Sequence, residues 1–181
     1  MLSNFINFFD IEKEIVFSDN LYLDIINQLG GVSLKEGLFT IFKKEDIEKW
    51  NKILEETYEN FGYKAKVFGY DWLGRCFGID LREESFGDIL MYEIGTAEVL
   101  EIPCDLEKFL DEEMPMESEA CLAETFFYDW SNYSKQKLTY GQCAGYKVPL
   151  FLNGQDTKEN LEISDMDVYW EIIRQVIKNG C

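Results

Sequence analysis

Carboxylates close to the C-terminus are the residues in this sequence most capable of chemistry. Five of them fall within one short segment: Asp156, Glu159, Glu162, Asp165 and Asp167. Paired carboxylates can act as general acid and base, and clustered oxygens can bind a hard cation. An EF-hand loop requires D-x-[DN]-x-[DN]-G and a glutamate at the twelfth position, which NGQDTKENLEIS does not supply.

A structural explanation covers the last two of these aspartates. Ser164 stands where a final helix would begin, and Asp167 follows three residues later as in a variant capping box. Asp165 and Asp167 would also complement the helix dipole in the first turn. Beyond them, Met166, Tyr169 or Trp170, Ile173 and Ile177 form an apolar stripe up to Asn179-Gly180. We therefore expect no metal site here, and a carboxylate enzyme ranks third among the functions considered.

Other catalytic chemistry is limited by what the sequence lacks. There is no histidine, which excludes Ser-His-Asp and Cys-His catalytic groups and nearly all zinc hydrolase sites. Neither G-x-x-x-x-G-K-[ST] nor G-x-G-x-x-G occurs. Five cysteines without a Cys-x-x-Cys pair indicate reduced thiols, and Cys76 and Cys143 lie beside glycines but without an activating base. We expect no enzymatic activity and no cofactor.

Length and composition predict one domain over residues 1–181 with a substantial core, because 46% of the residues are hydrophobic and 15% are aromatic. The N-terminal segment lacks a basic region and a small-residue cleavage site, so it does not read as a signal peptide. No segment has the roughly 18 consecutive apolar residues of a membrane span. We expect a cytoplasmic protein.

Acidic residues dominate the charge. The net charge is -18, and residues 98–129 hold 11 acids and a single base, Lys108, for a net of -10. Such a surface repels nucleic acid and anionic lipid and attracts basic partners. A merely solvated surface is the alternative that composition leaves open.

Hydrophobic periodicity predicts an α+β fold with a mainly antiparallel sheet of four to five strands packed by helices. Two antiparallel hairpins should turn at Asp71–Gly74 and at Glu93–Thr96. Helical patterns occupy residues 21–29, 44–62 and 105–130, and the last of these is interrupted near Pro115. A strand is expected at 37–42, between the first two helices.

The segment KVPLFL should be an edge or irregular extended segment, because Pro149 cannot donate a ladder hydrogen bond. Its apolar side chains, Val148, Leu150, Phe151 and Leu152, would fill the core. Gly154 would then turn the chain, and Leu161 and Ile163 would bring it back to the final helix.

The most specific motif of the sequence begins in this region. G-Y-K-x-P-L-F-L-x-G-x-D is matched by Gly145–Asp156, followed by ENLE at Glu159–Glu162 and DVYW at Asp167–Trp170. Its structural motif residues are Gly145, Tyr146, Lys147, Pro149, Gly154, Asp156, Asn160, Asp167, Tyr169 and Trp170. Together with FGYDWLGRCFGID and MYEIGTAEVLEIP upstream, it resembles the bacterial family named for the C-terminal domain of type VI secretion DNase-immunity proteins, from about Gly37 onward. That family is found with a GAD-like N-terminal partner domain. Many of its members have two glycines where this chain has Asn153-Gly154, and asparagine tolerates positive φ.

The resemblance implies an antitoxin or immunity protein, broadly SUKH-like in architecture, that binds and occludes a toxin. We expect a basic partner, such as a nuclease whose DNA groove is matched by acidic residues. The candidate partner-binding residues are Glu107, Asp111, Glu112, Glu113, Glu117, Glu119, Tyr128 and Tyr133. The acids should face solvent, because the neighbouring apolar side chains, Leu106, Phe109, Leu110, Leu122 and Phe126, take the buried side.

A second interpretation is a small-ligand or regulatory binding domain. Its pocket would be lined by Trp72, Tyr146 and Trp170. Large aromatic residues are more often core residues, and the core is the reading we favour for these three.

Overall fold

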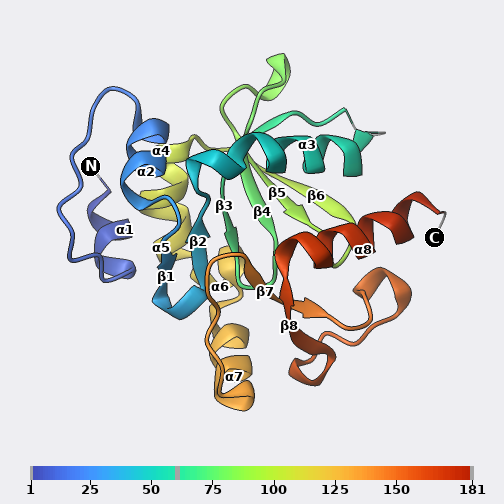
Figure 1. Cartoon of the computed structure of the whole chain (residues 1–181). Coiled ribbons are helices and arrows are strands. Elements are labelled where there is room, and N and C mark those ends of the chain that lie inside the picture. The colour runs from blue at the N-terminus through green and yellow to red at the C-terminus, as the bar shows by residue number, and fades with distance from the viewer. Residues whose placement is uncertain (1, 60–61, 180–181) are drawn as a thin grey trace.

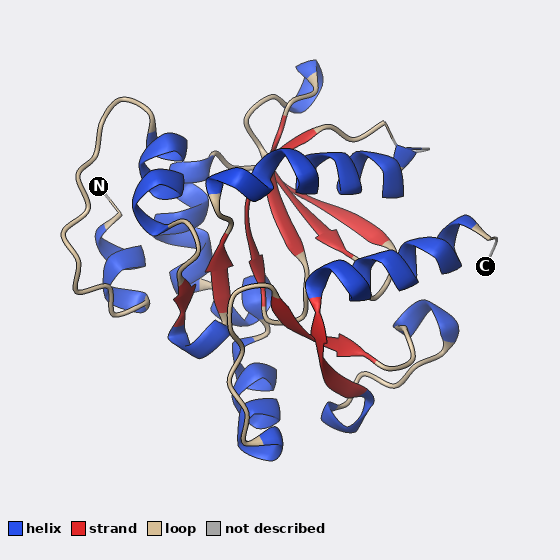
Figure 2. Ribbon diagram, in the orientation of Figure 1, coloured by secondary structure: helices blue, strands red, loops and turns tan. Residues whose placement is uncertain are grey.

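A six-stranded antiparallel sheet forms the centre of the molecule, which a computed structural model describes over residues 2–59 and 62–179. Its spatial order follows the chain, so each strand pairs with the next. Figure 2 shows its strands in red and the helices around them in blue. The strands are β1 (Ser33–Leu34), β2 (Phe39–Ile41), β3 (Ala65–Asp71), β4 (Cys76–Asp80), β5 (Ile89–Glu93) and β6 (Glu98–Ile102). A separate two-stranded sheet joins β7 (Gln142–Tyr146) to β8 (Leu161–Asp165).

Helices surround both sheets. They are α1 (Ser3–Phe8), α2 (Leu21–Leu29), α3 (Ile47–Thr57), α4 (Leu106–Lys108), α5 (Met114–Met116), α6 (Ser118–Leu122), α7 (Glu124–Ser134) and α8 (Met166–Lys178), with a π-helical turn at Phe109–Glu113 between α4 and α5. None of the helices in the described ranges has the length and apolar character needed to cross a lipid bilayer.

The alternation of side chains along the strands divides the core into two parts. Phe68 and Phe77 point to one face of the central sheet, where they pack with residues of α1, α2 and α4 to α7. Val67 and Leu90 point to the other face, which α3 and α8 cover (Figure 1). Period-two alternation on strands that are buried on both sides explains why the helices form two layers.

The predicted α+β class is confirmed, and the predicted hairpins are β3–β4 and β5–β6. The central sheet has six strands instead of four to five, because the two-residue strand β1 also pairs with β2. The helix predicted over residues 44–62 occupies Ile47–Thr57, preceded by a 3₁₀ turn at Lys44–Asp46. The helix at residues 21–29 has the predicted bounds.

The helix break predicted near Pro115 lies at Glu117, two residues further along the chain. Helical structure continues from Leu106 to Met116, and the chain leaves it at Glu117 and again at Ala123, where φ is 50°. Proline in a helix removes one hydrogen bond and crowds the preceding turn. The π turn immediately before Pro115 loosens that turn, since the Met114 N–H reaches back five residues to the Phe109 carbonyl oxygen.

The extended geometry predicted for KVPLFL is also wrong. Pro149 precedes a 3₁₀ turn at Leu150–Leu152, and Asn153 takes the expected positive φ, at 63°. Val148 is 46% exposed and Leu152 is 37% exposed, so neither fills the core. The backbone needs no strand partner here, because the side-chain amide of Asn160 bonds to the N–H and the carbonyl oxygen of Val148.

The N-cap of α8 is Asp165, one residue later than predicted. Its Oδ1 accepts hydrogen bonds from the N–H groups of Asp167 (3.0 Å) and Val168 (3.3 Å), whereas Ser164 lies within β8 opposite Cys143. The predicted capping box between Ser164 and Asp167 is therefore wrong. The apolar stripe is confirmed by the burial of Met166, Tyr169, Trp170 and Ile173, while Gly180, at the predicted helix end, lies outside the described residues.

Candidate functional site

The motif that begins at Gly145–Asp156 builds a scaffold around the loop between β7 and β8. Asn160 fastens this loop, since its amide also donates to the Gln155 carbonyl oxygen at 2.8 Å. Lys147 crosses the same loop, donating from Nζ to the Glu159 carbonyl oxygen and from its backbone N–H to the Asn160 carbonyl oxygen. The Gly154 N–H donates to the Pro149 carbonyl oxygen. A Cβ at Gly154 would lie 1.9 Å from the Val148 carbonyl oxygen, so only glycine fits here. These residues therefore hold the loop itself.

The remaining motif residues join this loop to α8 and to the central sheet. The Tyr146 hydroxyl donates to Asp156 at 2.6 Å, and its backbone N–H donates to the Tyr169 hydroxyl. A Cβ at Gly145 would meet the Tyr169 ring at 2.7 Å, so glycine allows α8 to approach β7 closely. Trp170 donates from Nε1 to the Gly74 carbonyl oxygen in the β3–β4 turn.

The β3–β4 turn carries a buried ion pair. Asp71 is fully buried, and Arg75 donates to it from Nε at 2.6 Å and continues to the Cys121 carbonyl oxygen. Glu93 lies 3.7 Å from the guanidinium of Arg75, and burial raises the pKa of its carboxyl group. The Trp72 indole donates to the Leu122 carbonyl oxygen from the same turn. This network connects the β3–β4 turn to the end of β5 and to α6. Its charged groups are used for packing and do not form an open binding site.

The three aromatic residues proposed for a ligand pocket do not share one. Trp72 and Trp170 are both fully buried, and they belong to the two different parts of the core. Tyr146 is 5% exposed and packs with the part that contains Trp72. The core interpretation of these residues is confirmed.

The carboxylates near the C-terminus are separated by their contacts. Asp156 accepts from Tyr146, Asp165 caps α8, and Asp167 pairs with Lys49 of α3 at 2.5 Å. Residues 2–59 and 62–179 contain no group of three or more carboxylate or thiol side chains placed to hold a metal ion. Cys76 and Cys143 are fully buried, and burial raises the pKa of both thiols.

Three of the eight candidate partner-binding residues also support the fold. Asp111 accepts hydrogen bonds from the N–H groups of Asn4 (2.8 Å) and Phe5 (3.2 Å), so it caps α1 from a distant helix. Glu113 pairs with Lys108 at 3.2 Å. Glu119 accepts from the Thr125 N–H at the start of α7, and this hydrogen bond lowers the pKa of its carboxyl group.

The other acids of these helices face solvent, as predicted. Glu107, Glu112 and Glu117 are exposed and make no side-chain hydrogen bond or ion pair within the described part of the chain. Phe109, Leu110 and Leu122 are buried beneath these helices, and Phe126 is partly buried. Tyr128 and Tyr133 on α7 are 44% and 55% exposed. The structure thus brings free carboxylates and exposed aromatic rings to one series of helices.

A groove of about 890 Å³ runs between α3 and α8, on the sheet face opposite to those acidic helices. Two ion pairs cross it, from Lys49 to Asp167 and from Arg174 to Glu56 at 2.6 Å. Glu45 and Glu48 line the α3 side, are exposed, and make no side-chain hydrogen bond or ion pair among residues 2–59 and 62–179. Five carboxylates and three cations line the groove in total, which leaves it with net negative charge.

Val168 and Ile172 form an apolar ridge along one side of this groove. They are 56% and 55% exposed, and they also line a second groove of about 450 Å³ beside Leu152 and Val176. Our sequence analysis missed this ridge because it followed only the buried stripe of the helix. The signal was available, since Val168, Ile172 and Val176 recur at intervals of four on the remaining side of the same helix.

Comparisons with known proteins identify the fold and no more. No family model matches the chain, and no curated protein matches it. The structure is similar to the crystal structure of Atu4351 from Agrobacterium tumefaciens, with a TM-score of 0.66 and 20% sequence identity. The match covers 97% of this chain and 89% of that chain. Similarity at this identity establishes a shared α+β fold, and the resemblance to the DNase-immunity family stays a prediction from the motifs quoted above.

Proposed function

We propose that this protein is an immunity protein or antitoxin, forming one SUKH-like domain in the cytoplasm, that binds and occludes a basic toxin such as a nuclease. It would act by covering the toxin surface and would catalyse no reaction. The proposal rests on the motif resemblance and on one structural observation: Glu107, Glu112 and Glu117 are exposed and form no ion pair within the described part of the chain. Like charges concentrated in this way repel one another, and a basic partner relieves that repulsion.

The acidic helices would act chiefly on the rate of encounter. Complementary charge raises association rates and selects against wrong partners, whereas affinity comes mainly from buried anchor residues. Tyr128 and Tyr133 offer exposed aromatic rings on α7, later in the same series of helices. Attraction between exposed charges fades beyond a screening length of about 8 Å at physiological salt.

The test uses the product of the neighbouring gene, once it is shown to be toxic when expressed alone, with co-expression, growth rescue and association kinetics as readouts. The charge-reversal variant is Glu107→Lys, Glu112→Lys and Glu117→Lys. It omits Asp111, because that residue caps α1. We expect association at least about tenfold slower at low salt, with the difference shrinking as salt is added.

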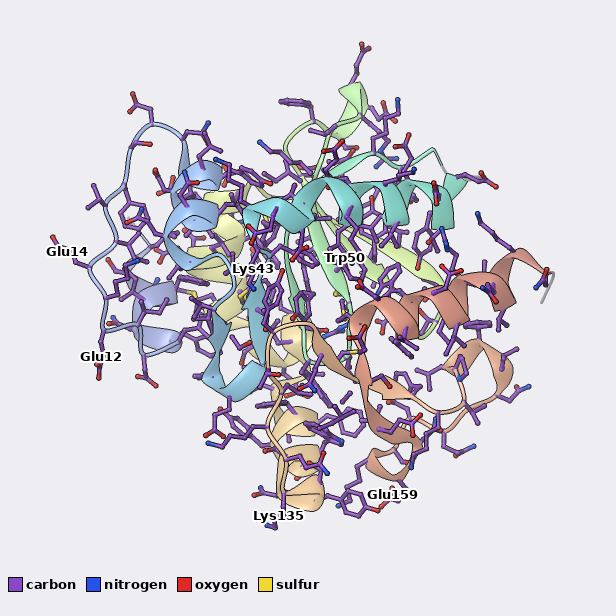
Figure 3. The ribbon with its side chains drawn as sticks, in the orientation of Figure 1. Glu12, Glu14, Lys43, Trp50, Lys135 and Glu159 are labelled. Atoms are coloured by element: carbon purple, nitrogen blue, oxygen red, sulfur yellow. The ribbon has the colours of Figure 1, made fainter. Side chains whose placement is uncertain are left out.

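The matched control is Glu12→Lys, Glu14→Lys and Asp19→Lys. These acids belong to the loop between α1 and α2, where Glu12 and Glu14 project away from the molecule (Figure 3). The control changes the net charge by the same amount but leaves Glu107, Glu112 and Glu117 in place. We therefore expect it to slow association much less. Failure to bind or neutralise the toxin would overturn the proposed function, and equal slowing by both variants would show a general charge effect.

A further inference from the structure

The apolar ridge on α8 remains largely exposed in the fold. Val168 and Ile172 are more than half exposed, although the same helix buries Met166, Tyr169, Trp170 and Ile173 against the sheet. Fully burying such a side chain is worth about 1.5–3 kcal/mol. Covering Val168 and Ile172 with a second surface would therefore be favourable, although the other side of α8 is already buried.

The shape on both sides of the ridge is suited to another helix. Val168, Ile172 and Val176 follow one another at intervals of four, which is the i±4 ridge that enters the groove of a neighbouring helix. The two grooves that flank the ridge would accept the side chains on each side of the incoming helix. Ile53 of α3 adds apolar surface on the far side of the larger groove.

The charges around the ridge favour a partner helix that carries positive side chains. Each base of the larger groove is already paired with an acid: Lys49 with Asp167, Lys52 with Glu56, and Arg174 with Glu56 and Glu171. Glu45 and Glu48 remain without such a partner in the part of the chain that the structure describes. Positive side chains at the edges of an incoming helix would find free carboxylates, and negative ones would not.

We infer that the α3–α8 groove and the Val168–Ile172 ridge bind an amphipathic, basic α-helix of a partner protein. The apolar face of that helix would lie on the ridge, and its Lys and Arg residues would face Glu45 and Glu48. This is the helix-in-groove mode of recognition, in which anchors at i, i+3, i+4 and i+7 supply the affinity. The inference deepens the proposed function by supplying apolar anchors, on the sheet face opposite to the acidic helices.

The first experiment uses a synthetic probe and needs no toxin. The probe is a fluorescent 18-residue peptide of leucine and lysine with leucines at i, i+3, i+4 and i+7, and a peptide with glutamate in place of lysine is its control. We expect the basic peptide alone to bind, with hydrogen exchange slowed in α3 and α8. Protection confined to α4 to α7 or to the β6 edge, or no binding of the basic peptide, would overturn the inference.

The protein variant is Val168→Ser with Ile172→Ser, which removes the apolar anchor without changing charge. We expect it to weaken peptide binding at least about tenfold while the urea-unfolding midpoint stays close to that of the wild type. Leu23→Ser is the matched control, because Leu23 is an exposed apolar residue of α2, 40% accessible, and lies outside both grooves. Unchanged peptide binding by the double variant would refute the anchor.

A second arm separates this inference from the proposed function. The double variant and the Glu107/Glu112/Glu117 reversal are each assayed against the toxin for association and dissociation rates. Loss of the anchor should raise the dissociation rate at least about tenfold, whereas the reversal should lower the association rate. Normal toxin binding by the double variant would refute this surface but leave the proposed function standing, and absence of toxin binding by the wild type would refute the proposed function while the peptide result still decides the groove.

Discussion

The indole N–H of Trp170 donates a 2.9 Å hydrogen bond to the carbonyl oxygen of Gly74, and it thereby joins α8 to the β3–β4 turn. Both partners are buried, so removing the donor leaves a carbonyl oxygen without its bond. We expect Trp170→Phe to lower the free energy of unfolding by about 1–3 kcal/mol. Urea unfolding measures the change, with the exposed substitution Tyr133→Phe as the control. A midpoint equal to that of the wild type would show that the contact contributes nothing.

The start of α8 can be tested with two neighbouring substitutions. Asp165→Ala removes the acceptor for the N–H groups of Asp167 and Val168 and should cost about 0.5–2 kcal/mol. Ser164→Ala lies in β8 and should change the unfolding free energy by less than about 0.5 kcal/mol. The reverse order of the two effects would restore Ser164 as the N-cap.

Asp111 should matter for stability although it lies in the acidic stretch. Asp111→Ala removes the cap of α1 and should lower the unfolding free energy by about 0.5–2 kcal/mol, with faster hydrogen exchange at Asn4 and Phe5. Its exposed neighbour Glu112, changed to alanine, serves as the control and should have little effect. Identical exchange rates in both variants would remove Asp111 from the cap.

Gly145 should be intolerant of a side chain. The Cβ of Gly145→Ala would press against the Tyr169 ring, and overpacking of this kind costs about 1–3 kcal/mol. In a Tyr169→Leu background the smaller side chain leaves space, so the same substitution should cost less. A double-mutant cycle of unfolding free energies gives the coupling, and a coupling of zero would rule out this close approach.

Alkaline pH should destabilise the protein through its buried tyrosines. Burial raises the pKa of Tyr22 and of Tyr70 to about 12, whereas the unfolded residues ionise near the ordinary value of about 10. The contribution of each phenol is therefore constant below pH ~10 and falls by about 1.4 kcal/mol per pH unit between pH ~10 and ~12.

Unfolding free energies measured from pH 8 to 11, together with tyrosinate absorbance, check this expectation. Tyr22→Phe removes one of these phenols, so its stability should fall less steeply above pH 10. Parallel curves for the variant and the wild type would contradict the assigned shift.

The hairpins and the last helix could be predicted because their signals are local. The turn at Asp71–Gly74 and the stripe of Met166, Tyr169 or Trp170 and Ile173 depend on neighbours in the sequence. The path through Pro115 and the turn after Pro149 could not be predicted, because they depend on a π turn and on the side chain of Asn160 at the far end of the β7–β8 loop.

Some features of the candidate site could also be predicted from local sequence, and others could not. The exposure of Glu107, Glu112 and Glu117 follows from helical periodicity, which the sequence contains. The use of Asp111 as the cap of α1 does not, since more than 100 residues separate its carboxylate from Asn4. The α3–α8 groove was invisible for the same reason, because no local pattern places these two helices side by side.

The ion pairs that cross the α3–α8 groove join residues 118 positions apart, Lys49 to Asp167 and Glu56 to Arg174. A growing chain therefore has no such groove when the six strands of the central sheet have all been synthesised, because that sheet ends at Ile102. The surface forms only after α8 has been synthesised. A chain that lacks α8 would lack one wall of the groove, and it would also lose the cover of one face of the central sheet.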